Sequence, residues 1–211
     1  MFTGLIQDIG AIVSIRQGQN HATLAIRSCL ANEISIGDSI AVNGVCLTAT
    51  RIEHDIFYVD VVPQSMRMTT LGALRISEKV NLEQAMRAQG RLDGHVVSGH
   101  IDGTGRIASL RKEGNAVLIT ICPASDLLKS MILQGSIAID GVSLTICALT
   151  SKDFTVSIIP HTGLATTLLS KRIGQIVNLE TDILAKYAQR SLAASSSMRG
   201  ISRDFLTQHG F

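Results

Sequence analysis

The sequence is poor in aromatic residues and carries almost no excess of charge. Its 211 residues include no tryptophan, two tyrosines and five phenylalanines, and 19 lysines and arginines stand against 17 aspartates and glutamates. Proteins that bind nucleic acid usually show a basic run or an aromatic platform for the bases, and neither is present here. The composition therefore argues against a nucleic-acid partner and gives no electrostatic indication of a target.

Long apolar runs and cysteine pairs are also missing. No apolar stretch approaches the ~20 residues that a membrane span needs, and the start, MFTGLIQDIG, lacks a basic region followed by an apolar run. Cys29, Cys46, Cys122 and Cys147 are widely spaced and form no C-x-x-C pair. This spacing argues against a disulfide framework and against a zinc site. We therefore expect a cytoplasmic protein without membrane contact, whose thiols are reduced and lie mostly in the core.

What the sequence does contain is an internal repeat. The segment AVNGVCLTAT at 41–50 returns 97 residues later as AIDGVSLTIC at 138–147. Blocks at 63, 69–71 and 80–83 keep this shift, whereas residues 2–6 align with 97–101 at a shift of 95, which a two-residue insertion explains. The chain is thus a tandem duplication. We expect one domain over 1–94, a second over 95–187 and an unrepeated helical tail over 188–211.

Short runs of alternating apolar and polar residues, bounded by turn residues, dominate both halves. They lie at 11–15, 21–26, 40–42, 45–50 and 56–62, and again at 106–110, 116–122, 136–139, 142–149 and 154–159. Alternation with a period of two is typical of strands. Helical patches are brief, near 29–34, 65–71 and 126–133. We expect an all-β protein of two tandem six-stranded Greek-key antiparallel β-barrels, followed by a C-terminal α-helix.

The end of the chain has a different pattern. From Asp182 the segment ILAKYAQRSLAA places apolar or small residues at helical spacing, until serines at 195–197 and Gly200 interrupt it. A second short amphipathic segment is expected from Ser202. An apolar helix outside two completed barrels needs another surface to cover it, so we interpret it as an oligomerisation element. The alternative is a helix that docks onto its own barrel.

The repeated segments predict two similar ligand sites. Hydroxyls, a thiol and backbone amides stand at equivalent strand ends, in blocks at 4–6 and 99–101, 46–48 and 143–145, and 60–65 and 157–162. Such groups suit a neutral ligand with an imide-like edge and hydroxyls rather than a phosphate. The phosphate-binding pattern G-x-G-x-x-G is also absent.

A set of motifs, in order along the chain, carries a resemblance to a known family. The motifs are MFTG at the start, NGVCLT and DGVSLT in the repeat, SGHIDGTG at 98–105, IIPHT at 158–162 and VNLETDILAKY at 177–187. As a set they resemble the riboflavin synthase family over roughly residues 1–190. Members of this family are trimers with two lumazine-binding barrels in each chain.

This resemblance implies a dismutation that needs no cofactor. Two molecules of 6,7-dimethyl-8-ribityllumazine exchange a four-carbon unit and give riboflavin and 5-amino-6-ribitylaminopyrimidinedione. One barrel would hold the donor and the other the acceptor, in sites that meet between the N-terminal barrel of one subunit and the C-terminal barrel of a neighbour. The resemblance also implies a homotrimer and allows an association with lumazine synthase.

The family motifs and the repeat together indicate which residues contact the substrate. The predicted substrate-binding set is Phe2, Thr3, Gly4, Leu5, Ile6, Cys46, Leu47, Thr48, Asp60, Val61, Val62, Pro63, Gln64, Ser65, Gly99, His100, Ile101, Gln134, Ser143, Leu144, Thr145, Ser157, Ile158, Ile159, Pro160, His161 and Thr162. Because the chain has few aromatic plates to stack on each substrate, we expect the two heterocycles to stack on one another.

Four residues are candidates for the chemistry. The C7 methyl of a lumazine is acidic because its carbanion is delocalised into the ring, so a modest base suffices, and His100 is the first candidate. Cys46 or Ser39 could supply or position the nucleophile that attacks C7 of the partner ring. Asp140, where the first half has Asn43, would mark a division of labour. The simpler alternatives are a satisfied histidine, a small buried thiol and a turn cap.

One rival function and one histidine stay open from the sequence, and a second rival function is excluded. Lumazine proteins share the duplicated barrel but bind one fluorescent ligand and catalyse nothing; the intact blocks at 143–145 and 158–162 favour the enzyme. A flavin-domain oxidoreductase would need a nucleotide-binding α/β half, for which the duplication leaves no room. His95 is balanced between a site role and a structural one.

Overall fold

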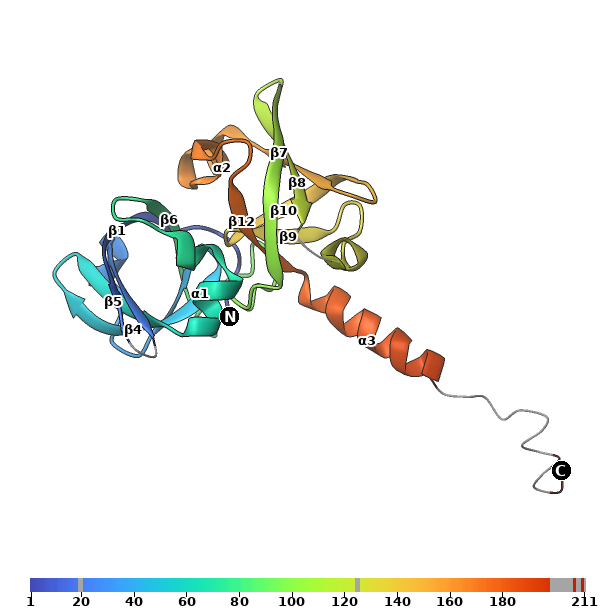
Figure 1. Ribbon diagram of the computed structural model, residues 1–211, viewed down its shortest axis with the longest axis horizontal. Coiled ribbons are helices and arrows are strands. Elements are labelled where there is room, and N and C mark those ends of the chain that lie inside the picture. The colour runs from blue at the N-terminus through green and yellow to red at the C-terminus, as the bar shows by residue number, and fades with distance from the viewer. Residues whose placement is uncertain (19–20, 124–125, 198–206, 208–209, 211) are drawn as a thin grey trace.

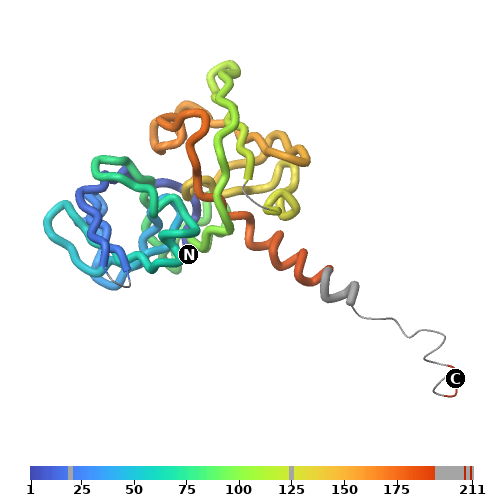
Figure 2. The backbone as a smooth tube through the Cα atoms, in the orientation of Figure 1, coloured from blue at the N-terminus to red at the C-terminus, as the bar shows by residue number. Residues whose placement is uncertain are grey.

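The computed structural model describes residues 1–18, 21–123 and 126–197, together with residues 207 and 210. Two closed barrels lie side by side and a single helix leads away from them (Figures 1 and 2). The first barrel consists of β1 (Asp8–Gln17), β2 (Ala22–Arg27), β3 (Ser39–Val42), β4 (Val45–Glu53), β5 (Ile56–Val61) and β6 (Lys79–Gln84), closed in the order β1-β2-β5-β4-β3-β6.

The second barrel repeats the first strand for strand. It consists of β7 (Gly103–Glu113), β8 (Ala116–Pro123), β9 (Ser136–Ile139), β10 (Val142–Leu149), β11 (Phe154–Ile158) and β12 (Ile176–Thr181). Its strands close in the order β10-β11-β8-β7-β12-β9. With β7 to β12 equivalent to β1 to β6, this is the cyclic order of the first barrel, started at the fourth strand and followed in the opposite direction. Neighbouring strands are antiparallel in both barrels. The prediction of two six-stranded antiparallel barrels with a C-terminal helix is confirmed.

Short helical turns join the strands at equivalent places in the two halves. The first half has η1 (Cys29–Asn32), α1 (Pro63–Met68) and η2 (Thr70–Ala73), and the second has η3 (Asp126–Ser130), α2 (Pro160–Ala165) and η4 (Leu168–Ser170). Both α1 and α2 begin with a proline after an extended residue, Val62 or Ile159. Proline suits this first helical position because its missing N–H would have no partner there.

Each barrel encloses its own apolar core. In β4 the side chains of Val45, Leu47 and Ala49 are buried, whereas Cys46 is half-buried and Thr48 is exposed. This alternation is what a strand needs when one of its faces lies in the core. Phe57 fills the first core and Phe154 the second. The alternating pattern seen in the sequence thus separates an apolar interior from a polar outer face.

The two barrels are joined by hydrogen bonds that repeat about a pseudo-two-fold axis. Asn81 Nδ2 donates to the carbonyl of Asp140 at 2.9 Å, and Asn178 Nδ2 donates to the carbonyl of Asn43 at 2.8 Å. Asn81 Oδ1 accepts from Thr167 N and Asn178 Oδ1 from Thr70 N, both at 2.7 Å. Both asparagines are fully buried, so this seam holds the barrels in one relative placement.

The seam contains one charged pair with no equivalent in the other half. Asp140 is fully buried and its Oδ2 lies 2.9 Å from Lys171 Nζ. Burial raises the pKa of Asp140, and the nearby Lys171 ammonium opposes that rise. At the shift of 97 the corresponding residues of the first half are Asn43 and Leu74, so the acid and the base replace an amide and an apolar side chain together.

The segments that precede the barrels cross from one barrel to the other. Phe2 and Val97 form an antiparallel bridge and pack with Ala41 and Ala138 in a third apolar cluster between the barrels. Beyond this bridge, Ile6 packs on the core of the second barrel and residue Ile101 on the core of the first. The first residues of each half therefore pack on the barrel of the other half. The domain boundaries at 94 and 187 stay a prediction.

The last described helix, α3 (Ile183–Ser197), leaves the second barrel and points away from it (Figure 1). Near its start Lys186 Nζ lies 2.7 Å from Asp102 Oδ1, and Gln189 Nε2 donates to Lys129 O at 2.7 Å. Leu184 and Tyr187 are each 68% exposed. The helix therefore does not lie along its own barrel.

One detail of the predicted tail is wrong. The serines at 195–197 do not interrupt the helix, since α3 runs through to Ser197. Serine costs a helix well under 1 kcal/mol relative to alanine, so three serines at a helix end are tolerated. The amphipathic segment predicted from Ser202 lies outside the described residues. None of the helices in the described ranges is long and apolar enough to cross a membrane.

Candidate functional site

The first candidate surface is the outer face of β4 and β5. Cys46 and Thr48 of β4 point outward, and Asp60 of β5 is exposed beside them. Val62 follows at the strand end, 58% exposed, and leads into α1 with Ser65 half-buried. This face, with residues 99–101, is called the N surface below.

The N surface is completed by a segment from the other half of the chain. Cys46 N donates to the carbonyl of Gly99 at 2.9 Å, which lays residues 99–101 along β4 and leaves His100 exposed beside it. Gly99 has a φ of +83°, and a Cβ there would lie 2.5 Å from Cys46 Cβ. Only glycine fits so close to the strand. The backbone at Gly99 therefore sets the distance between His100 and β4.

The second barrel carries the equivalent C surface, formed by β10, β11, α2 and residues 4–6. Ser143 N donates to the carbonyl of Gly4 at 2.8 Å, and a Cβ on Gly4, whose φ is +78°, would lie 2.5 Å from Ser143 Cβ. The outward residues of this face are Thr145, Ser157, Ile159, Pro160 and His161, which are exposed, and Ser143 and Thr162, which are half-buried. Leu5 is exposed above them. Leu144 packs against the barrel core instead.

Two buried glutamates hold the crossing segments. Glu83 of β6 accepts hydrogen bonds from Thr3 N and Oγ1, both at 2.6 Å, and from Gly4 N at 3.0 Å. Glu180 of β12 accepts in the same way from Ser98 N at 2.6 Å, Ser98 Oγ at 2.7 Å and Gly99 N at 3.0 Å. Each carboxylate thus positions the segment that completes one ligand surface. We call them the clamp glutamates.

The pKa of Glu83 is set by its burial and its hydrogen bonds. Burial raises the pKa of Glu83, and the hydrogen bonds from Thr3 and Gly4 oppose that rise because they favour the charged form. The same residue borders a hollow of about 500 Å³ together with Thr3, Leu5 and Ile6. The crossing segment of the C surface therefore lies against an open space large enough for a small heterocycle.

A histidine that the sequence left open distinguishes the C surface from the N surface. His95 Nδ1 lies 2.6 Å from Ser143 Oγ, the atom that takes the place of the Cys46 thiol. His95 is 9% exposed, and its Nε2 has no hydrogen-bond partner among the described residues. Burial lowers the pKa of His95, with Asp182 opposing the change, so the neutral ring is favoured. The repeat offers no counterpart, because residue 95 aligns with a position before Met1.

The lowered pKa of His95 predicts a dependence of stability on pH. Since the folded chain takes up this proton less readily than the unfolded chain, its unfolding free energy should fall as the pH drops below the ordinary value of 6.5. The slope contributed by one group is at most about 1.4 kcal/mol per pH unit. Urea unfolding measured from about pH 7.5 to about pH 5.5, a range that brackets 6.5, should show this loss in the wild type and a smaller loss in His95→Gln. His161→Gln, an exposed histidine, is the control. Equal slopes in all three proteins would contradict the assignment.

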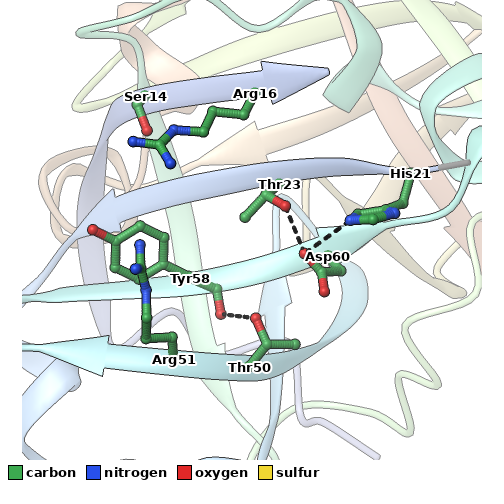
Figure 3. Close-up of a pocket in the computed structure, with 8 residues that line it drawn as sticks. All are labelled: Ser14, Arg16, His21, Thr23, Thr50, Arg51, Tyr58 and Asp60. Atoms are coloured by element: carbon green, nitrogen blue, oxygen red, sulfur yellow. Dashed lines mark hydrogen bonds and ion pairs between the residues drawn. The ribbon is translucent and has the colours of Figure 1, made fainter. Parts of the chain in front are cut away.

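The N surface extends into a hollow of about 310 Å³ that the sequence did not predict (Figure 3). Asp60 Oδ1 accepts from Thr23 Oγ1 at 2.7 Å and lies 3.9 Å from His21 Nε2. The Arg51 guanidinium lies 3.6 Å above the centre of the Tyr58 ring. Arg51, Tyr58 and Asp60 are outward residues of β4 and β5, so the alternation around Asp60 carries the signal. Thr23 lies on β2, and His21 lies just before that strand.

The second barrel has an equivalent hollow of about 350 Å³ with a different character. It is bordered by Cys147, Thr155 and Ser157, where the first barrel has Thr50, Tyr58 and Asp60. Arg51 is replaced by Ala148 at the same shift. The two surfaces therefore share a backbone frame but differ in charge and aromatic content.

Several predicted site residues lie elsewhere. Leu47, Val61 and Ile158 are buried in the barrel cores, so their side chains do not reach the outer faces. Phe2 is fully buried between the barrels, and its Cε2 would lie 3.0 Å from a Cβ on Gly99, so it backs the N surface. Asp140 lies at the seam, where its carboxylate contacts Lys171 and accepts from Asn178 N.

The remaining predicted residues lie at the edges of the two faces. Ser39 of β3 pairs with Thr48 of β4, which places it next to the N surface. Gln134, Pro63 and Gln64 are exposed, and Gln134 N donates to Ile146 O at 2.9 Å. Within the described ranges, no three histidines, cysteines, aspartates or glutamates gather as metal ligands would. Both faces present hydroxyls and backbone groups, which suit a polar ligand without formal charge.

Comparison with known proteins agrees with this geometry. The lumazine binding domain family matches the chain twice, over residues 3–85 and 98–182. The riboflavin synthase of Actinobacillus pleuropneumoniae is 45% identical and that of Bacillus subtilis (strain 168) is 43% identical, each over 100% of both chains. Crystal structures of LumP complexed with 6,7-dimethyl-8-(1'-D-ribityl) lumazine and with riboflavin superpose with TM-scores of 0.78 and 0.80, at 26% and 27% identity. These matches cover 86% of this chain and 99% of the LumP chains.

The two matched repeats coincide with the two barrels, and each includes the segment that crosses to the other barrel. The full-length relatives at more than 40% identity extend the match through the tail. The chain belongs to the riboflavin synthase family.

Proposed function

We propose that this chain is a transferase that converts two molecules of 6,7-dimethyl-8-ribityllumazine into riboflavin and 5-amino-6-ribitylaminopyrimidinedione by transfer of a four-carbon unit. The observation that carries this proposal is the pair of matched surfaces with different reactive groups. A dismutation needs two sites that bind the same molecule and treat it differently. The N surface offers the Cys46 thiol and His100, and the C surface offers the Ser143 hydroxyl with His95.

His100 is proposed as the base that removes a proton from the C7 methyl of one lumazine. It is exposed, and the carbonyl of the preceding Gly99 is fixed to β4, so its position relative to a ligand is defined. His100→Gln is expected to bind lumazine within about threefold of the wild type, whereas exchange of the C7 methyl protons with deuterium should slow by at least tenfold, as general catalysis contributes about 10²–10⁴-fold. Proton NMR of lumazine in deuterium oxide measures this exchange. Unchanged exchange would assign the base elsewhere.

Cys46 and Ser39 are proposed to position the nucleophile that attacks C7 of the second lumazine. Cys46 is half-buried on the N surface, and Ser39 lies across from Thr48 in the neighbouring strand. The carboxylate of Asp140 is already engaged at the seam, where it accepts from Asn178 N at 2.8 Å and contacts Lys171. We therefore favour a structural contribution for Asp140.

The assembly is proposed to be a homotrimer in which the N surface of one subunit faces the C surface of the next. The exposed apolar side chains of α3 support an association through the tail. Removal of the residues after Tyr187 is expected to convert the trimer into monomers at micromolar concentration, as measured by light scattering. An unchanged mass would assign the assembly to the barrels instead. A cytoplasmic location and an association with lumazine synthase are carried over from the family.

The proposed reaction is tested by incubating the purified chain with 6,7-dimethyl-8-ribityllumazine under anaerobic conditions and without cofactor. One riboflavin and one pyrimidinedione should form for every two lumazines consumed, as followed by riboflavin absorbance and chromatography. Tight lumazine binding without any turnover would make the chain a ligand carrier, which is the alternative suggested by the similarity to LumP.

A further inference from the structure

A further hollow lies on the seam between the two barrels. It has a volume of about 730 Å³ and is bordered by α1, η2 and the start of β6 on one side and by η4 and the start of β12 on the other. Its border includes Arg67 and Met68 at the end of α1, but none of the residues predicted to contact the substrate. We call this hollow the seam groove.

The seam groove is rich in positive charge. Arg67, Arg75 and Lys79 border it, and none of the three forms an ion pair with another described residue. Glu78 is the single acid along its described border, and its Oε2 accepts from the backbone N of Arg75 at 2.9 Å. Lys171 also borders the groove, but Asp140 neutralises it. Three cations therefore face one unpaired carboxylate in a chain whose overall net charge is only +2.

Two threonines that border the groove carry buried hydroxyls with no hydrogen-bond partner in the part of the chain that the structure describes. Thr167 is 4% exposed and borders the groove, and its Oγ1 has no hydrogen-bond partner among the described residues. The Oγ1 of Thr70, its equivalent in the first half, is likewise without a described partner. The backbone N–H groups of both residues are already used by Asn178 and Asn81. Because buried polar atoms are normally paired, an orphaned hydroxyl on each of two residues that border the groove points to a missing acceptor there.

The charge of the groove is an addition to the repeated frame. At the shift of 97, Lys79 corresponds to Ile176 and Arg67 to Leu164. Arg75 corresponds to Arg172, but only Arg75 borders the groove. The barrel fold itself therefore does not require these cations, since the second half forms the same turns without two of them.

We propose that the seam groove is a binding site for a phosphoryl group. Two guanidinium groups and an ammonium with nearby hydroxyl donors match the charge and the acceptor oxygens of a phosphate dianion, and arginine pairs with such oxygens through two parallel hydrogen bonds. The hollow is much larger than inorganic phosphate, which favours a phosphate ester of a small molecule as the occupant. This site is independent of the proposed function, because it contains none of the residues predicted to contact the substrate.

The test is isothermal titration of the full-length chain at low ionic strength with glycerol 3-phosphate, inorganic phosphate and, as the uncharged control, glycerol. The phosphoryl ligands should bind saturably to one site per chain, and glycerol should not bind. Tighter binding of the ester would identify a phosphorylated small molecule as the ligand, and equal affinities would identify free phosphate. Both outcomes support the phosphoryl site. If neither phosphoryl ligand binds saturably at concentrations up to about 10 mM, which covers even weak specific binding, the proposal is overturned.

Matched variants make the test specific to the groove. Arg75→Gln and Lys79→Ile are expected to weaken phosphoryl binding at least tenfold each, since one charge-assisted hydrogen bond is worth about that factor. Arg172→Gln, the repeat equivalent of Arg75, should bind within twofold of the wild type. Equal losses in Arg75→Gln and Arg172→Gln would show a nonspecific charge effect and overturn the proposal. Lumazine turnover should be unchanged in all three variants, which separates this result from any failure of the dismutation assay.

Discussion

Replacing Glu180 by glutamine is expected to remove one of the two ligand sites of the chain and to leave the other intact. The carboxylate accepts three hydrogen bonds, from Ser98 N, Ser98 Oγ and Gly99 N. Glutamine has one acceptor oxygen and an NH₂ group that only donates, so at least one of these donors would face another donor. Hydrogen bonds to a charged group are worth about 1.5–3 kcal/mol each, so the segment that carries His100 should leave β4.

Titration with riboflavin measures the loss directly. The wild type should bind two riboflavins per chain and Glu180→Gln only one, and lumazine turnover should fall by at least ~100-fold because the reaction requires two rings held together. Glu83→Gln is the complementary variant: it should also retain one site, and that site should be the N surface. Two sites with nearly wild-type turnover in either variant would show that the clamp glutamates do not position the crossing segments.

The second large effect is expected at the seam, where Asp140→Asn should destabilise the chain although asparagine is the natural residue at the equivalent position. The introduced amide oxygen could still accept from Asn178 N, as Asp140 Oδ1 does at 2.8 Å, but Lys171 would keep its charge without a partner at 17% side-chain exposure. Removing one member of a buried ion pair typically costs about 3–5 kcal/mol. The variant should therefore show a lower urea midpoint with an unchanged slope.

The double variant Asp140→Asn/Lys171→Leu copies the pair Asn43 and Leu74 of the first half. Replacing a buried ion pair by well-packed uncharged residues is often neutral or stabilising by about 1–4 kcal/mol, so this protein should unfold at or above the wild-type midpoint. All three proteins are compared at one protein concentration, since association shifts the midpoint. A double variant as unstable as Asp140→Asn alone would mean that the ion pair is not what distinguishes the two halves.

The fold was predictable because the alternation of apolar and polar residues is a local pattern and occurs in both halves of the chain. Alternation in segments such as 45–50 separates core from surface in a strand, and the repeat at 142–147 confirms that the pattern belongs to a unit. The outward residues Cys46, Thr48, Ser143 and Thr145 follow from the same alternation. The same alternation directs the side chains of Leu47 and Val61 into the core, so a substrate contact predicted for them would come from their backbone.

The contacts between the halves could not be predicted, because alternation does not say which barrel a segment joins. Nothing in MFTG shows that Gly4 lies on Ser143 or that Glu83 holds Thr3, about eighty residues away in the chain. His95 has no repeat partner that could have indicated its contact with Ser143. The role of Asp140 was equally hidden. The change from Asn43 to Asp140 between the repeats suggested a catalytic carboxylate, but the structure pairs that carboxylate with Lys171, which itself replaces Leu74.

The crossing segments also bear on how such a chain arose. A single ancestral half would carry a first segment with no second barrel in its own chain to lie on, so two copies related by a two-fold axis would have to exchange these segments, as in a domain-swapped dimer. The pseudo-symmetric contacts of Gly4 with Ser143 and of Gly99 with Cys46 preserve that exchange within one covalent chain. Because both halves now lie in one chain, the two surfaces need not be identical. A symmetric dimer must change both of its sites at once, whereas the fused chain could keep a thiol at one and acquire a hydroxyl at the other.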